Sequence, residues 1–249
     1  MFTLSSLFLG FLALLQILKA NFTDVVLLLG GSVLLDGFDG TVARLTKTES
    51  NFGVQLDSLV DAVTFGLVSS ILVYYWGFKE LDPQLGKVIG FLFLSAGIIR
   101  LARFNVLKEA HVMPSNIFVG LPIPLGALSI LSAVLVVGRP LQTKQEMMFF
   151  SAYVILVAFL MISSIKYRAL KRFKSKYNLL ILLALAIIVA LSINFTRITI
   201  PAVTLLYIIS PIIFFIVNKL RKTKPATVPT HTPVPEEEWD TVNENGQEQ

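Results

Sequence analysis

Long apolar runs alternate along the chain with short polar segments that carry most of the charged residues. A helix needs about 20 apolar residues to cross the roughly 30 Å hydrocarbon core of a bilayer, and most of the runs approach that length. The pattern therefore predicts an all-α, polytopic membrane helical bundle with about eight transmembrane helices. The expected helices span residues 2–18, 25–42, 53–78, 88–101, 121–137, 147–165, 179–193 and 198–217.

Composition narrows the class of protein further. The chain has 249 residues, of which 55% are hydrophobic and 15% charged, and its mean hydropathy is +0.75. These values are typical of a membrane protein and leave no room for a sizeable domain outside the bilayer. The absence of cysteine excludes disulfides, thiolate catalysis and cysteine metal sites. The only histidines are His111 and His231, so a histidine metal site is not expected.

Basic residues predict the orientation of the helices. Fifteen Lys and Arg residues fall in the segments after the second, fourth, sixth and eighth expected helices, whereas six fall in the other four. By the positive-inside rule, both termini face the cytoplasm. We expect this charge to contact anionic lipid headgroups and no nucleic acid. Tyr74, Tyr75 and Trp76 are expected to form an interfacial aromatic belt. Residues 1–218 then form the transmembrane domain, and residues 219–249 form a disordered cytoplasmic tail.

Four acidic residues lie in or beside the second and third apolar runs: Asp36, Asp39, Asp57 and Asp61. Each costs roughly 2.5–3.5 kcal/mol in the middle of a membrane helix, so they must line a wet cavity or hold cations. Their spacing puts each pair on one helical face, and a short polar segment between the runs predicts a helical hairpin. At 1.5 Å per residue, Asp36 and Asp61 each lie about 12 Å below the loop, at one depth.

Carboxylates without histidine or cysteine suit hard cations such as Mg²⁺ or Mn²⁺, which in turn bind pyrophosphate oxygens. A calcium-binding EF-hand loop is excluded, because Phe38, Gly40 and Thr41 stand where that loop needs acid, acid and glycine. The pattern alone thus predicts a metal-dependent site for a diphosphate substrate at the cytoplasmic end of the second and third helices. Gly40, Ala43 and Gly53 would either admit the substrate close to the helix backbones or permit tight helix packing.

These residues together resemble a family signature. The pattern D-x-x-D-G-x-x-A-R, eight residues, then G-x-x-x-D-x-x-x-D is similar to the signature of the CDP-alcohol phosphatidyltransferases. All of its positions are filled, by Asp36, Asp39, Gly40, Ala43, Arg44, Gly53, Asp57 and Asp61. The words RLARFN, residues 100–105, and FVGLPIP, residues 118–124, resemble the phosphatidylserine synthase branch of that family.

The resemblance implies an enzyme that moves the phosphatidyl group of CDP-diacylglycerol to the hydroxyl of L-serine. It implies that Asp36, Asp39 and Asp57 ligate one or two Mg²⁺ or Mn²⁺ ions, and that Asp61 joins the second site or acts as the general base. The expected donor-binding residues are Asp36, Gly40, Ala43, Arg44, Ser50 and Gly53. We further expect a homodimer in contact with membrane lipids, in a bacterial cytoplasmic (inner) membrane.

Arg100 and Arg103 lie three residues apart near the end of the fourth expected helix, and Asn105 follows. We predict that these three residues bind the acceptor or its attacked phosphate, because a carboxylate or phosphate needs a cationic partner. The alternative is that the two arginines only anchor the helix end at the cytoplasmic surface.

Three functions remain open at this point. The first is transfer to serine, and the second is the same chemistry with another alcohol, of glycerol phosphate or inositol type, or with an ether-lipid donor. The third is a cation transporter, which would distribute acids through the bundle, whereas here they are confined to one hairpin.

Overall fold

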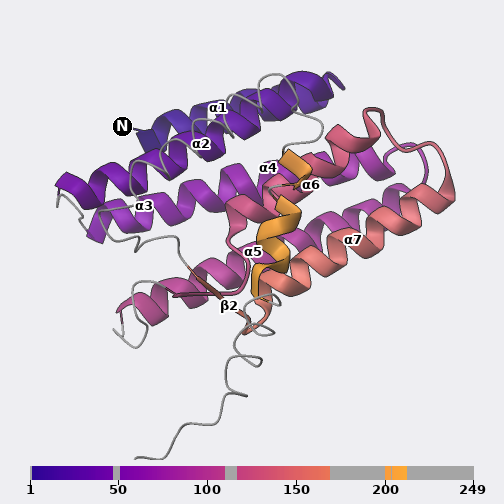
Figure 1. The fold of residues 1–249 in the computed structure, drawn as a ribbon. Helices are drawn as coiled ribbons and strands as arrows, with labels where there is room; N and C mark the ends of the chain where they lie inside the picture. Colours follow the sequence, from indigo (N-terminus) through magenta and orange to yellow (C-terminus); the bar gives the residue numbers. More distant parts are fainter. Residues whose placement is uncertain (1, 47–50, 110–116, 169–199, 203, 212–249) are drawn as a thin grey trace, which may run out of the picture. The chain divides into compact units, whose positions relative to one another are not determined.

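A computed structural model describes residues 2–46, 51–109, 117–168, 200–202 and 204–211. These residues all belong to one unit, Met1–Ile212. The predicted tail, residues 219–249, and the predicted helix at residues 179–193 lie outside the described residues. Figure 1 shows helices packed side by side, as the apolar periodicity predicts.

The first two helices, α1 (Phe2–Leu18) and α2 (Phe22–Thr46), form a hairpin and lie along one another (Figure 1). Ala20 makes the tight turn with a positive φ of 57°, and the Asn21 side chain then bonds Asp24 in the first turn of α2. Within the hairpin the hydroxyls of Ser6 and Ser32 lie 2.7 Å apart. Both are buried, so this contact satisfies polar groups that lipid would leave unpaired.

The third expected helix is continuous but not uniform. It consists of α3 (Asn51–Asp61), the π-helical segment η1 (Ala62–Leu67), α4 (Val68–Val73) and a second π-helical segment, η2 (Tyr74–Phe78). A π-helical turn holds an extra residue and therefore rotates the side chains that follow it, and such turns are frequent at functional sites. The first one begins directly after Asp61.

The second π-helical segment overturns part of the aromatic-belt prediction. Trp76 is only 2% exposed, and its ring meets that of Phe150 edge to face, with centroids 5.0 Å apart. It is a core residue that packs against Phe150. Tyr75 is half-buried, and Lys79 lies over its ring.

Three further helices complete the labelled bundle: α5 (Pro83–Glu109), α6 (Ile123–Val137) and α7 (Lys144–Ile162). Gly138, with a φ of 71°, ends α6 in the left-handed conformation that glycine adopts without strain. Thr143 and Glu146 form a capping box that begins α7. Arg139, which precedes α7, forms an ion pair of 2.7 Å with Glu146. The hydrogen bond to that carboxylate raises the pKa of Arg139.

Residues 200–202 and 204–211 are also helical, within the eighth expected run. The sequence did not predict a short antiparallel ribbon, in which β1 (Ile117–Val119) pairs with β2 (Lys166–Arg168). The all-α class is therefore confirmed for the described residues apart from these six. The count of eight helices stays a prediction.

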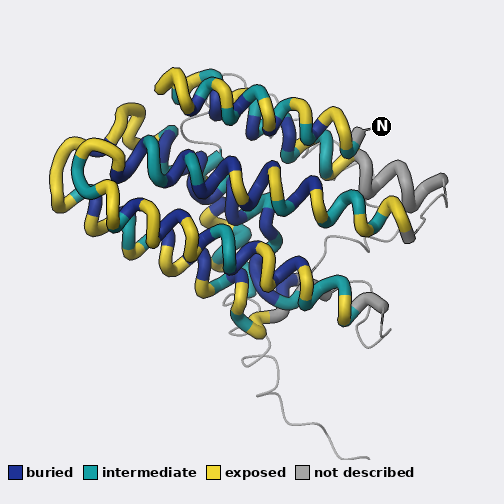
Figure 2. Tube along the Cα trace, turned by 180° about the vertical axis from the view of Figure 1, so that it is seen from behind, coloured by how far each residue is buried: buried dark blue, intermediate teal, exposed yellow. Residues whose placement is uncertain are grey.

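Burial is distributed as in a membrane protein. Figure 2 shows buried residues where helices face one another and exposed residues on their outward faces. Many of the exposed residues are large and apolar, such as Phe149 at 79% and Phe91 at 70% exposure. Such apolar coverage would be a liability in water but suits lipid. Three described helices are long and apolar enough to cross a membrane: Phe52–Phe78, Pro83–Leu107 and Lys144–Ile162. The chain is an integral membrane protein.

Candidate active site

Acidic side chains from α2 and α3 come close to one another. Asp36 of α2 lies within hydrogen-bonding range of the Asp61 carboxyl of α3, and Asp57 is near enough for its charge to act on Asp61. The sequence predicts that Asp36 and Asp61 lie at one depth, and the structure brings them together. Asp36 and Asp57 are half-buried, whereas Asp61 is only 8% exposed.

Asp61 holds the most constrained carboxylate of the three. Its Oδ1 atom is buried and has no hydrogen-bond partner in the protein. A buried carboxylate without a partner is costly, and two acids beside it add repulsion. The arrangement is stable only if protons or cations compensate the negative charge.

The donor set fits a hard divalent cation, because carboxylate oxygens from two helices converge and one buried oxygen has no protein partner. Among the described side chains, no three acids, histidines or cysteines are placed to hold a metal ion by themselves. The predicted further ligand, Asp39, has its backbone in α2 but its side chain outside the described residues. Metal binding stays a prediction.

The structure does not describe the side chains of most of the predicted donor-binding residues. Gly40, Ala43 and Arg44 lie in the last turns of α2, but nothing of their side-chain surroundings is described, and Ser50 lies outside the described residues. Gly53 is exposed in the first turn of α3. Their roles toward a nucleotide stay predictions.

Arg100 approaches the acids from α5. It is 5% exposed, and its charge acts on Asp61. The guanidinium carbon lies 5.2 Å from the centre of the Phe104 ring, a cation–π contact, while Nε has no hydrogen-bond partner. Arg100 therefore retains a donor for an anion beside the acidic cluster.

Arg103, one turn further along α5, has different surroundings. Its Nη1 atom donates to the Ile162 carbonyl at 2.6 Å, and its Nη2 atom faces the carbonyls of Ser163, Val119 and Met161 at 2.9, 3.2 and 3.3 Å. The last carbonyls of a helix lack partners within the helix, so Arg103 caps α7 and joins β1 to it. Its guanidinium is occupied by backbone, and its predicted acceptor role stays untested.

Asn105 is linked to the acidic helix instead of facing open space. Its amide nitrogen donates to the Ser58 hydroxyl at 3.0 Å. Since Ser58 follows Asp57 in α3, this contact ties the end of α5 to the helix that carries two of the acids.

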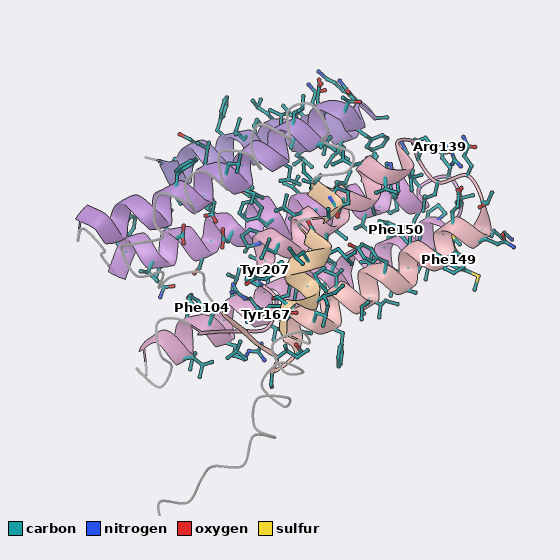
Figure 3. All side chains as sticks on the ribbon, viewed as in Figure 1. Phe104, Arg139, Phe149, Phe150, Tyr167 and Tyr207 are labelled. Atoms are coloured by element: carbon teal, nitrogen blue, oxygen red, sulfur yellow. The ribbon has the colours of Figure 1, made fainter. Side chains whose placement is uncertain are left out.

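Two tyrosines near Arg100 were missed by the sequence analysis. Tyr207, from the helix at residues 200–211, is close enough to Arg100 for electrostatic interaction. Its ring stacks on that of Tyr167 in β2, with centroids 5.4 Å apart and planes 9° from parallel (Figure 3). No motif marks either residue, because the contact joins segments 40 positions apart across a ribbon that the apolar pattern does not predict.

Residues 1–164, which include the described acids and both arginines, match the family model of the CDP-alcohol phosphatidyltransferases. The chain belongs to the CDP-alcohol phosphatidyltransferase family. The match ends near the last residue of α7, so the family region contains the helical hairpin, α5 and the carbonyls that Arg103 binds.

Curated members of the family resemble the chain over most of its length. A Helicobacter pylori protein is 35% identical over 199 residues, which are 79% of this chain and 81% of the relative. A Methanocaldococcus jannaschii protein is 38% identical over 154 residues, or 62% and 66%. A Bacillus subtilis protein is 34% identical over 128 residues, or 51% and 70%. All three are named CDP-diacylglycerol–serine O-phosphatidyltransferase.

Proposed function

We propose that this chain transfers the phosphatidyl group of CDP-diacylglycerol to the hydroxyl of L-serine, giving phosphatidylserine and CMP. The observation that carries the proposal is that Asp36 of α2 and Asp57 of α3 both interact with Asp61 of α3. The names of relatives that match up to 79% of the chain support serine as the acceptor. The chain is thus an enzyme of phospholipid biosynthesis.

On the donor side, Asp36, Asp39 and Asp57 would hold one or two Mg²⁺ or Mn²⁺ ions. When bound, such ions would supply positive charge to neutralise the pyrophosphate and the charge that develops on departing CMP. Gly40, Ala43, Arg44, Ser50 and Gly53 surround the CDP moiety in this proposal, on the strength of the family signature.

On the acceptor side, Asp61 takes the proton of the serine hydroxyl. The serine oxygen then forms a bond to the phosphorus that bears diacylglycerol, and the bond from that phosphorus to the CMP oxygen breaks. Burial of the unpartnered Oδ1 atom of Asp61 supports this assignment, because a base must reach the hydroxyl without competing hydrogen bonds. Asp61 holds this proton and releases it to solvent before the next turnover.

The two arginines take separate parts. Arg100 binds the acceptor anion, since its buried guanidinium keeps a free donor beside Asp61. Arg103 positions the end of α7 and β1 through its bonds to backbone carbonyls, and Asn105 holds α3 through Ser58.

The protein works as a homodimer in a bacterial inner membrane, with both termini and the acidic site toward the cytoplasm.

An acceptor panel tests the proposal. Purified protein is given CDP-diacylglycerol and Mg²⁺ or Mn²⁺, and CMP release is measured with L-serine, glycerol 3-phosphate, myo-inositol and inositol phosphate. We expect release that requires the metal and is fastest with L-serine. Faster release with any other alcohol would contradict the acceptor assignment, and no release with any alcohol would contradict the enzyme class.

A further inference from the structure

Of the two arginines on α5, only Arg100 has an Nε atom that is buried without a partner. The four carbonyls around Arg103 fix that side chain in the backbone of α7 and β1. We therefore expect an anion beside Asp61 to be bound by Arg100 and by a second hydrogen-bond donor close to Arg100. Besides Asp61 and Arg103, the Tyr207 phenol interacts with Arg100.

Tyr207 is held in a defined orientation. Its half-buried ring is stacked on that of Tyr167, which is 1% exposed (Figure 3). The Tyr167 hydroxyl is buried and has no hydrogen-bond partner, and burial raises the pKa of this phenol. Tyr167 thus remains neutral and serves as a fixed platform for the Tyr207 ring.

The ribbon that carries Tyr167 is itself fixed to the bundle. Gly120, directly after β1, has a φ of 78° and donates its amide hydrogen to the Ile165 carbonyl at 2.8 Å. A side chain at this position would collide with the Met161 carbonyl and with Arg103. The motifs RLARFN and FVGLPIP are therefore in contact, through Arg103 and Gly120. Their contact fixes β1, and with it the paired strand β2 and Tyr167.

We propose that Tyr207 forms, together with Arg100, the subsite for the carboxylate of an amino-acid acceptor, and that Tyr167 positions the Tyr207 ring by stacking. A carboxylate accepts several hydrogen bonds, and a guanidinium beside a phenol hydroxyl offers donors from two directions. Arg100 interacts with Asp61 as well as with Tyr207, so an acceptor whose carboxylate is held by Arg100 and Tyr207 would have its hydroxyl near the base. This inference rests on the proposed function.

Acceptor discrimination is the property that the subsite controls. L-serine carries the carboxylate, whereas L-serinamide keeps the hydroxyl and ammonium but has a neutral amide. A site with buried donors aimed at a carboxylate rejects an analogue that leaves those donors unpaired. Tyr207 is therefore a specificity-determining residue, and its removal is expected to harm turnover of serine more than turnover of serinamide.

The experiment measures kcat/KM for both acceptors with the purified full-length protein, saturating CDP-diacylglycerol and Mg²⁺. For Tyr207→Phe we expect kcat/KM for serine to fall about 10-fold or more, mainly through a higher KM, as for a lost bond to a charged group. The value for serinamide should stay within about twofold, so the preference for serine shrinks. KM for CDP-diacylglycerol should not change.

Variants at Tyr167 supply a second test that does not alter the contacting residue. Tyr167→Ala removes the stacking partner and should raise KM for serine, whereas Tyr167→Phe keeps the ring and should lose much less. Tyr153→Phe is the matched control, because Tyr153 bonds the Ser129 carbonyl at 3.1 Å between α7 and α6 and takes no part in the subsite. It should retain the wild-type preference.

The outcomes separate the inference from the function on which it rests. If the wild type turns over serine and Tyr207→Phe keeps the full preference over serinamide, the subsite is contradicted while the proposed function stands. If Tyr167→Phe loses as much as Tyr167→Ala, the stacking role is contradicted. A wild type that turns over another alcohol but not serine contradicts the proposed function and, with it, the carboxylate subsite.

Discussion

At the scale of single residues, Asp61 joins the two halves of the reaction. It lies on the α3 face that also carries Asp57, one turn further along the helix, and it interacts both with Asp36 and with Arg100. A residue so placed can influence the metal-binding acids and also receive the acceptor's proton. Substitutions at the neighbouring acids should therefore affect different steps.

Asp57→Asn is expected to abolish turnover while leaving a folded protein. The change removes one ligand charge, and a catalytic cation contributes several kcal/mol, so we expect a loss of at least about 100-fold. CMP release measures the effect, and Asp36→Asn and Asp39→Asn should behave alike. A melting curve serves as the folding control and should shift upward, because the substitution neutralises a membrane acid. Retention of most activity in two of the three variants would refute the ligand assignment.

Asp61→Asn should separate donor binding from chemistry. As general base, Asp61 contributes about 10²- to 10⁴-fold to the rate, so single-turnover CMP release should fall by that factor. Affinity for CDP-diacylglycerol should remain near the wild-type value. Both quantities are measured on the same preparation across pH. A parallel collapse of affinity and rate would show that Asp61 is chiefly a metal ligand.

At the scale of elements, Arg103 joins the β1–β2 ribbon to the end of α7. Four carbonyls lie around one guanidinium, and the left-handed backbone of Gly120 brings the chain close enough for this contact. A planar guanidinium can bond several carbonyls in fixed directions, which the point charge of a lysine cannot do. The element pair therefore depends on both residues.

Arg103→Lys is expected to destabilise the protein by about 2 kcal/mol, the scale of one or two lost bonds to a charged group. Thermal unfolding in detergent, followed by light scattering or tryptophan fluorescence, measures the loss. KM for serine should rise as well, because the ribbon carries Tyr167. An unchanged melting temperature would contradict the capping role of Arg103.

Gly120→Ala should lower stability by about 1–3 kcal/mol, since it combines a left-handed backbone with a collision at the Met161 carbonyl. Gly30→Ala is the matched control: Gly30 lies in α2 with nothing within 4 Å of an added Cβ, and alanine favours the helix. The melting temperatures of the two variants should therefore move in opposite directions. Equal shifts would contradict the close approach at Gly120.

The apolar pattern predicted the elements better than their ends. The first helix begins and ends where the sequence predicts, at residues 2 and 18, whereas α5 extends well beyond the expected residues 88–101, to Pro83–Glu109. Hydropathy underestimates α5 because its last turns carry Arg103 and Asn105, whose polar groups are satisfied by tertiary contacts. The π-helical turns at η1 and η2 were not predictable, because they keep the apolar run and change only the rotation of side chains.

The candidate site divides in the same way. The convergence of Asp36 with Asp61 follows from helical spacing and a short loop, so the sequence alone could predict it. The difference between Arg100 and Arg103 could not be predicted, because both are arginines near one helix end. Only the carbonyls of α7 and β1, distant in sequence, distinguish them. Tyr207 was missed for the same reason.

At the scale of the whole molecule, the bundle surrounds an acidic site with lipid-facing apolar surfaces. The donor substrate is a lipid, so its reacting phosphate must meet a water-soluble amino acid at the boundary of the bilayer. The acids of α2 and α3, with Arg100 beside them, meet that requirement. The excess of Lys and Arg in alternate loops predicts that this boundary is the cytoplasmic one.

The central claim is that this cluster of acids catalyses transfer of a phosphatidyl group to L-serine. The most direct measurement follows labelled L-serine into lipid and CMP into solution, with purified protein in liposomes that contain CDP-diacylglycerol and Mg²⁺. The account predicts one labelled lipid for each CMP released, with both products reduced together at least about 100-fold in Asp61→Asn. CMP release without labelled lipid, or equal labelling by the wild type and Asp61→Asn, would contradict it.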